Sequence, residues 1–138
     1  MTTFLRASAG GHDLLLDCAS VQRAAEADRD EPDIATWAGH DLPILDLSWK
    51  LGGWPLDRSN CAVIIYAAEF DQNGAVVLAV DEINGLVNLE PQALARLPTI
   101  PGRVPHFFDR IAVEPIDGRY PLCLRERLDI WAIERDDA

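Results

Sequence analysis

Thiols and imidazoles are the side chains of this sequence best suited to chemistry. They are three cysteines and three histidines, scattered along the chain: Cys18, Cys61, Cys123, His12, His40 and His106. No C-x-x-C or H-x-x-x-H pair supplies the close spacing of a metal site. A thiol nucleophile would need an imidazole beside it in space. Because each cysteine has apolar or small neighbours, we expect buried, reduced thiols.

Other catalytic patterns are also missing from the sequence. None of the four serines lies in a G-x-S-x-G elbow, and Lys50 is the only lysine, so no phosphate loop with its lysine exists. The adjacent acids Asp81 and Glu82 would face opposite sides of a strand. We therefore expect no catalytic residue, no metal and no cofactor. A small hydrolase that uses Cys61 or Cys123 with a histidine is the least favoured hypothesis.

Composition limits the partners. The chain has 138 residues, of which 49% are apolar, which suits one domain or two small lobes that share a core. Its net charge of −11 repels phosphate backbones and anionic lipid, so we expect neither nucleic acid nor membrane insertion. No apolar run approaches the roughly 20 residues that span a bilayer. The N-terminal residues do not read as a secretory signal, and we expect a cytoplasmic protein.

The elements that would position a site are mostly strands. Short apolar runs between turn residues predict them at Phe4–Ala7, Asp13–Leu16, Leu42–Leu47, Cys61–Ala67, Ala75–Val80, Asp81–Leu89 and Tyr120–Leu124. Asp46 is expected to cap a helical turn over Leu47–Leu51 that Gly52 closes. A short helix or turn is expected over Ser20–Ala27 and a helix over Arg125–Ile133. Gly85 would allow a bulge inside its strand.

Two segments of the sequence resemble one another. Each of Gly39–Leu51 and Gly118–Leu128 has a glycine, a proline-containing apolar strand and a helical turn that ends in leucine. This echo predicts two similar lobes. Four aromatic residues lie in predicted loops or strand ends, and they either anchor an interface or plug the ends of small barrels: Trp37, Trp54, Phe107 and Phe108.

The run from Val80 to Pro98 resembles the signature of the CheW-like domain. It has an apolar strand, then V-D-E-apolar-x-G-apolar-V, and finally a Leu-Pro. Gly39–Leu51, Gly118–Leu128 and Phe4–Val21 resemble the family's two Pro-strand units and its opening hairpin. The resemblance covers nearly the whole chain. It implies one all-β domain over residues 1–138, with short helices and two five-stranded SH3-like β-barrel lobes around a common core.

The resemblance also implies a function. CheW-like proteins are non-enzymatic adaptors that couple chemoreceptors to the histidine kinase CheA. The helical receptor tip lies in the groove between the lobes. Carried over by position, Ile83, Leu86 and Val87 would lie near this groove. Gly85 would bend the strand, and Asp81 would hydrogen-bond a turn rather than touch a partner.

This sequence departs from the family pattern in its first half. Ala38 stands where the family has an arginine that contributes to receptor contact, so a charge-assisted contact is lost there. The stretch from Val21 to Gly39 is also shorter than its counterpart, which predicts an abbreviated first lobe. With Trp37, Ala38 completes the expected partner-binding residues. The alternative role is a CheW-like regulatory module that binds another signalling protein through Trp37 or Trp54.

Overall fold

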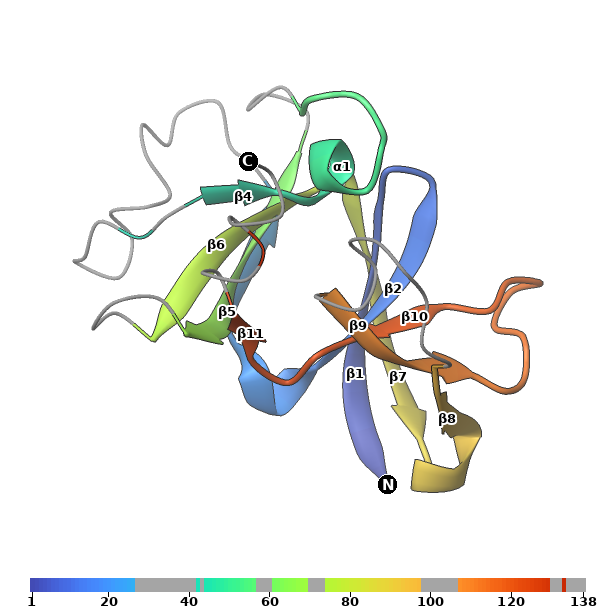
Figure 1. The fold of residues 1–138 in the computed structure, drawn as a ribbon. Helices are drawn as coiled ribbons and strands as arrows, with labels where there is room; N and C mark the ends of the chain where they lie inside the picture. Colours follow the sequence, from blue (N-terminus) through green and yellow to red (C-terminus); the bar gives the residue numbers. More distant parts are fainter. Residues whose placement is uncertain are drawn as a thin grey trace.

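Two β-sheets make up the structure, a computed structural model that describes residues 1–26, 42, 44–56, 61–69, 74–97, 107–129 and 133 (Figure 1). The first sheet has six strands in the order β7 (Glu82–Leu89), β1 (Thr2–Ala9), β2 (His12–Asp17), β10 (Leu122–Leu124), β9 (Phe108–Ala112) and β8 (Leu94–Arg96). The second has the order β11 (Leu128–Asp129), β5 (Ala62–Glu69), β6 (Ala75–Val80) and β4 (Ile44–Asp46), with β3 (Val21–Glu26) also paired to β5. The fold is therefore all-β, as predicted.

Helical structure among the described residues is short. The elements are one α-helix, α1 (Leu47–Lys50), and two 3-10 turns, η1 (Cys18–Ser20) and η3 (Pro91–Ala93). None of the helices in these stretches is long and apolar enough to cross a bilayer. The predicted helical turn after Asp46 is confirmed by α1, and Gly52 follows it with the positive φ of 90° that glycine tolerates.

Three apolar clusters divide the structure into layers. The largest lies between the two sheets, because it combines residues of β1 and β2, such as Leu14, with residues of β5 and β6, such as Ile64. A second cluster, which contains Val63 and Val77, occupies the opposite face of β5 and β6. The third, around Phe4 and Leu15, lies on the opposite face of the six-stranded sheet. The two sheets thus share one central core, and their division into two barrel lobes within one domain stays a prediction.

Strand β7 contains the predicted bulge. In its antiparallel pairing with β1, Gly85 lies opposite Arg6 while Ile83 lies opposite Ala7, so Asn84 is the extra residue. Gly85 has a φ of 116°, which only glycine adopts readily. The bulge reverses the alternation of side chains along the strand. Ile83 consequently packs on the central core, whereas Val87 packs on the outer cluster with Phe4.

The helix or turn predicted over Ser20–Ala27 is wrong over Val21–Glu26, and the helix predicted over Arg125–Ile133 is wrong at Leu128–Asp129, although Ile133 is helical. Instead of a helix or turn over Ser20–Ala27, β3 follows η1 and pairs antiparallel with β5. Within Arg125–Ile133, residues Leu128–Asp129 form β11, which pairs in parallel with the end of β5. In both places, β5 offers a strand edge whose hydrogen bonds outweigh a weak local preference for helix.

Candidate functional site

Asp81 connects the turn between β1 and β2 to the start of β7. Its carboxylate Oδ2 accepts a hydrogen bond from the Gly10 N–H at 3.0 Å. Its own N–H donates to the Ser8 carbonyl oxygen at 2.8 Å. The prediction that Asp81 hydrogen-bonds a turn is confirmed. The point where the chain passes from one sheet to the other is therefore fixed by side-chain and backbone contacts.

The loop after α1 is held by the side chain of Asp46. One carboxylate oxygen accepts from the Trp49 N–H at 3.0 Å and caps α1, and the other accepts from the Leu56 N–H at 2.8 Å. The Ser48 hydroxyl is buried and donates to the Trp54 carbonyl oxygen at 2.8 Å. These bonds fix the backbone on both sides of Trp54 and so define where this tryptophan is presented.

Gly53 lets this loop approach the β1–β2 turn closely. A Cβ atom at Gly53 would lie 2.8 Å from the Gly10 Cα, closer than side chains approach a backbone atom. The Gly53 N–H also donates to the Ser48 carbonyl oxygen at 2.7 Å. Backbone therefore packs on backbone where α1 and its loop meet the hairpin of the other sheet.

An open hollow of about 540 Å³ lies at this junction. Its lining combines the β1–β2 turn, the α1 loop and the start of β7: Gly10, Gly11, Ser48, Gly53, Trp54, Pro55, Leu56 and Asp81. Trp54 is 86% exposed on its rim, and Trp49 on α1 is 55% exposed. We call the hollow with Trp49 and Trp54 the junction surface. Exposed tryptophans on a fixed backbone are typical of protein-binding surfaces.

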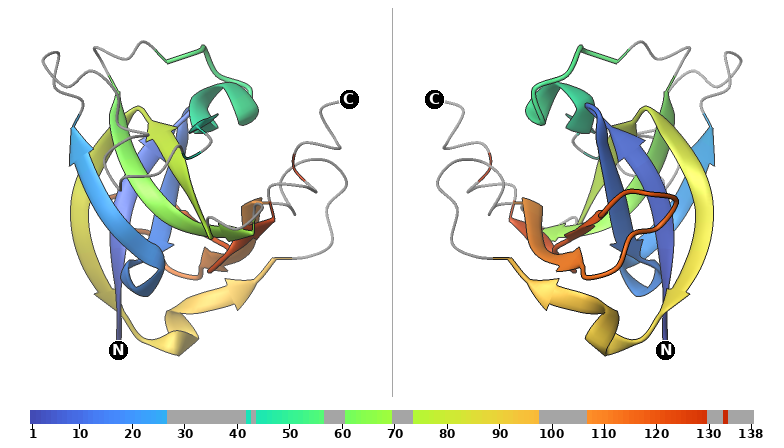
Figure 2. Two further views of the ribbon diagram at one scale, coloured as in Figure 1. Left: turned by 90° about the vertical axis from the view of Figure 1, so that its left-hand side faces the viewer. Right: turned by 90° about the vertical axis from the view of Figure 1, so that its right-hand side faces the viewer.

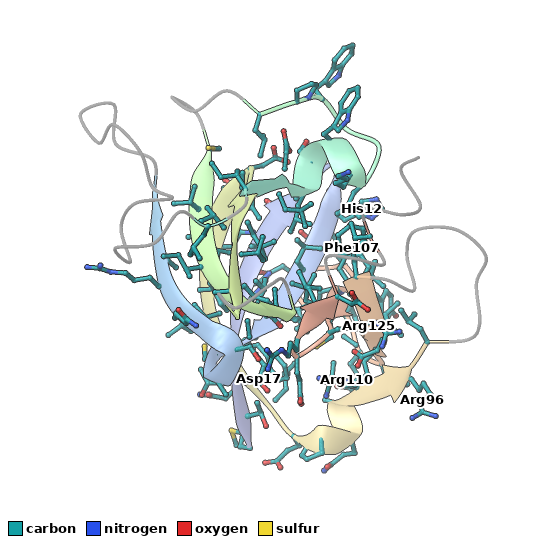
Figure 3. The ribbon with its side chains drawn as sticks, turned by 60° about the vertical axis from the view of Figure 1, so that its left-hand side comes forward. His12, Asp17, Arg96, Phe107, Arg110 and Arg125 are labelled. Atoms are coloured by element: carbon teal, nitrogen blue, oxygen red, sulfur yellow. The ribbon has the colours of Figure 1, made fainter. Side chains whose placement is uncertain are left out.

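The aromatic residues noted in the sequence divide into two groups. Trp54 is exposed, whereas Phe107 and Phe108 are both 1% exposed and belong to the central core. Phe107 is labelled in Figure 3. The two phenylalanine rings fill the interior and do not anchor an interface. Trp49 was missed by sequence reasoning. A signal existed, because a capped single turn with Leu47 inward leaves the residue two positions later outside.

The expected partner-binding residues of β7 do not share one face. Leu86 is 66% exposed, while Ile83 and Val87 are half-buried against different clusters. Leu86 is therefore the side chain of this group that a partner reaches most easily. Trp37 and Ala38 lie outside the described residues.

The cysteines are placed as structural residues rather than as nucleophiles. Cys123 is fully buried, and its sulfur accepts a hydrogen bond from the Arg110 guanidinium at 3.4 Å. Burial raises the pKa of its thiol to about 11, so it is protonated at neutral pH. Cys61 is buried in the cluster beyond β5 and β6. Burial raises the pKa of the partly buried Cys18 as well.

The other chemistry-bearing residues provide no cluster in the part of the chain that the structure describes. There, no three histidine, cysteine, aspartate or glutamate side chains are placed to hold a metal ion. His12 is exposed at the start of β2. His40 and His106 lie outside the described ranges.

The order of strands, the shared central core and the bulged β7 together define a CheW-like fold. The crystal structure of the scaffolding protein TtCheW from Thermoanaerobacter tengcongensis is similar, with a TM-score of 0.70. The similarity covers 90% of this chain and 88% of that chain, at 15% sequence identity. No protein-family model and no curated protein matches the sequence. The predicted CheW-like fold is confirmed.

Proposed function

We propose that this protein is a non-enzymatic scaffold in bacterial chemosensory signalling that couples receptors to a CheA-type histidine kinase. The observation that carries the proposal is the CheW-like fold, which extends over 90% of the chain and is shared with a scaffolding protein. The junction surface supports it, because the exposed Trp54 lines the hollow where the sheets meet and Trp49 is exposed on the adjoining α1. In this role the protein acts in the cytoplasm and forms no covalent intermediate.

Partner binding in this proposal is mainly apolar. Ala38 supplies no guanidinium at the position where the family has an arginine. The large apolar side chains exposed on β7, on α1 and in the loop after α1 are Leu86, Trp49 and Trp54. Apolar contacts are screened little by salt, in contrast to ion pairs. Affinity for the kinase or receptor should therefore change little with ionic strength.

Co-purification tests the proposal. The wild-type chain should retain a CheA-type kinase regulatory domain or a receptor cytoplasmic fragment on a column. Leu86→Asp places a charge on an exposed apolar residue and should weaken that binding without unfolding the chain. Val113→Asp is the matched control, since Val113 is 49% exposed on another segment. Failure of the wild-type chain to bind either partner at high concentration would count against the proposal.

A second function keeps the fold and changes the partner. The 86% exposure of Trp54 favours a regulatory module that binds another signalling protein through this residue. In that case Trp54→Ala should abolish retention of the other protein. The kinase domain and receptor fragment should then bind neither form of the chain.

A further inference from the structure

Arg96 differs from the other basic side chains. Among the arginine and lysine residues that the structure describes, it is the one with no hydrogen bond or ion pair. By contrast, Arg6 pairs with Asp117 at 2.9 Å, and Arg119 with Asp13 at 3.6 Å. Arg96 is exposed at the end of β8 (Figure 3). Its charge is therefore available to a partner.

A second arginine lies directly opposite Arg96. In the antiparallel pairing of β8 with β9, Arg96 is in register with Arg110. Directly opposed side chains have Cβ atoms about 5 Å apart, and like charges in that arrangement destabilise a sheet. Arg110 is partly neutralised, because its Nε lies 3.5 Å from an Asp109 carboxylate oxygen. The uncompensated positive charge is thus concentrated at Arg96, on a chain whose net charge is −11.

Among the described residues, no strand pairs with the outer edge of β8. The Leu97 N–H donates to Asp109 O, and the Val113 N–H donates to Ala93 O, both at 2.9 Å. Residues 93, 95 and 97 therefore face β9, and Leu94 and Arg96 face outward by alternation. The Leu94 N–H already donates a hydrogen bond to the Pro91 carbonyl oxygen of η3. The Leu94 C=O and both backbone groups of Arg96 are left at the edge of the sheet.

We propose that the edge of β8 binds an extended acidic segment of a partner protein by strand addition. The added strand would take backbone hydrogen bonds from Leu94 and Arg96. Its carboxylate would face Arg96, and an apolar side chain two residues away would face Leu94, which lies on the same side of β8. An exposed arginine disfavours pairing with neutral or basic strands, so this edge is selective for acidic ones.

This surface is separate from the junction surface. Figure 2 shows η3 and β8 at one end of the molecule and α1 at the opposite end. The proposal does not rest on the proposed coupling of receptor and kinase. A segment could occupy the β8 edge while a second partner binds the junction surface.

A peptide titration tests the proposal. The probe is a fluorescein-labelled peptide, acetyl-Thr-Val-Thr-Glu-Thr-Val-Thr-amide, whose symmetry serves both strand directions. It should bind the wild-type chain and bind Arg96→Gln at least about tenfold more weakly, which corresponds to about 1.4 kcal/mol. Arg119→Gln removes the same charge away from β8 and should keep wild-type affinity. Circular dichroism and the melting temperature confirm that both variants are folded.

Two altered probes separate the contacts. Replacing Glu by Lys in the peptide should abolish binding to the wild-type chain and restore it to Arg96→Glu. A peptide that is N-methylated at its Val, Glu and central Thr residues should not bind, because it cannot donate to a ladder in either strand direction. Absence of binding to the original peptide, equal losses in Arg96→Gln and Arg119→Gln, or unchanged binding of the N-methylated peptide would each overturn the proposal. A dimer of the chain that Arg96→Gln dissociates would also overturn it, in favour of a second copy.

Discussion

Tyr66 joins the central core to the segment that links β10 and β11. Its ring is fully buried, and its hydroxyl donates to the Arg125 carbonyl oxygen at 2.6 Å. Burial raises the pKa of the phenol well above its usual value, although a hydrogen bond from Ser20 acts in the opposite direction. A buried polar group of this kind stabilises the fold only while its partner is present.

Removal of that hydroxyl should be costly. Tyr66→Phe leaves the partly buried Arg125 carbonyl without this donor and should lower the free energy of unfolding by about 1–3 kcal/mol. Urea denaturation measures the loss. Tyr120→Phe is the matched control, because Tyr120 is 55% exposed and should change stability little. Equal stability of both variants would show that the Arg125 contact does not stabilise the fold.

The same residue gives the protein an alkaline pH dependence. The unfolded chain releases the tyrosine proton near pH 10, whereas the folded chain keeps it to higher pH. The contribution to stability is therefore complete below about pH 10 and is lost as the pH rises further. Unfolding measured from pH 8 to 11 should show this decline in the wild type and a shallower one in Tyr66→Phe. Parallel curves would contradict the assignment.

Thiol reactivity tests the placement of the cysteines. At pH 8 the folded protein should react quickly with Ellman's reagent at Cys18 alone, because Cys61 and Cys123 are buried. The raised pKa of Cys123, about 11, further lowers its thiolate fraction. All three thiols should react in denaturant. Fast reaction at Cys123 in the folded state, located by mass spectrometry, would restore the thiol-enzyme hypothesis.

At the scale of elements, α1 depends on a single carboxylate. Asp46→Ala removes the cap of α1 and the acceptor for the Leu56 N–H, and should cost about 1–2 kcal/mol. It should also weaken binding at the junction surface, because the loop that presents Trp54 is no longer fixed. Urea denaturation and the co-purification assay measure these effects. Glu114→Ala, at an exposed position, should do neither.

The bulge in β7 requires glycine at position 85 for its backbone conformation, not because a side chain would clash there. A Cβ atom at Gly85 would meet nothing within 4 Å, so the penalty in Gly85→Ala comes from its φ of 116°. We expect a loss of about 1–3 kcal/mol in unfolding free energy. Asn84→Ala, at the neighbouring exposed position, should cost much less. An equally small loss in Gly85→Ala would mean that the bulge moves away from residue 85.

Elements with local signals were predictable from the sequence. Asp46 and Gly52 mark the ends of the α1 turn, and Gly85 marks the bulge. Strands β3 and β11 were not predictable, because their partner β5 lies far away in the sequence. The candidate site was likewise predictable only where its features depend on nearby residues in the sequence. The turn contact of Asp81 was predicted correctly, and Trp54 was expected in a loop, but the bulge places Ile83 and Val87 on different faces, and that placement depends on register with β1.

At the scale of the whole molecule, two sheets share one core and leave different surfaces at opposite ends. The junction surface carries exposed tryptophans, and the β8 edge carries an unpaired arginine among the described basic residues. Under the two proposals made above, the chain holds two partners at once without changing its own structure. That property is what a coupling scaffold requires, and no catalytic step is needed for it.

Sedimentation velocity of a three-component mixture tests this account most directly. The components are the purified chain, a CheA-type kinase regulatory domain and a receptor cytoplasmic fragment. The account predicts a faster-sedimenting species that contains all three and disappears when the chain is omitted. Sedimentation of the chain as a free species at every concentration of the other two would contradict it.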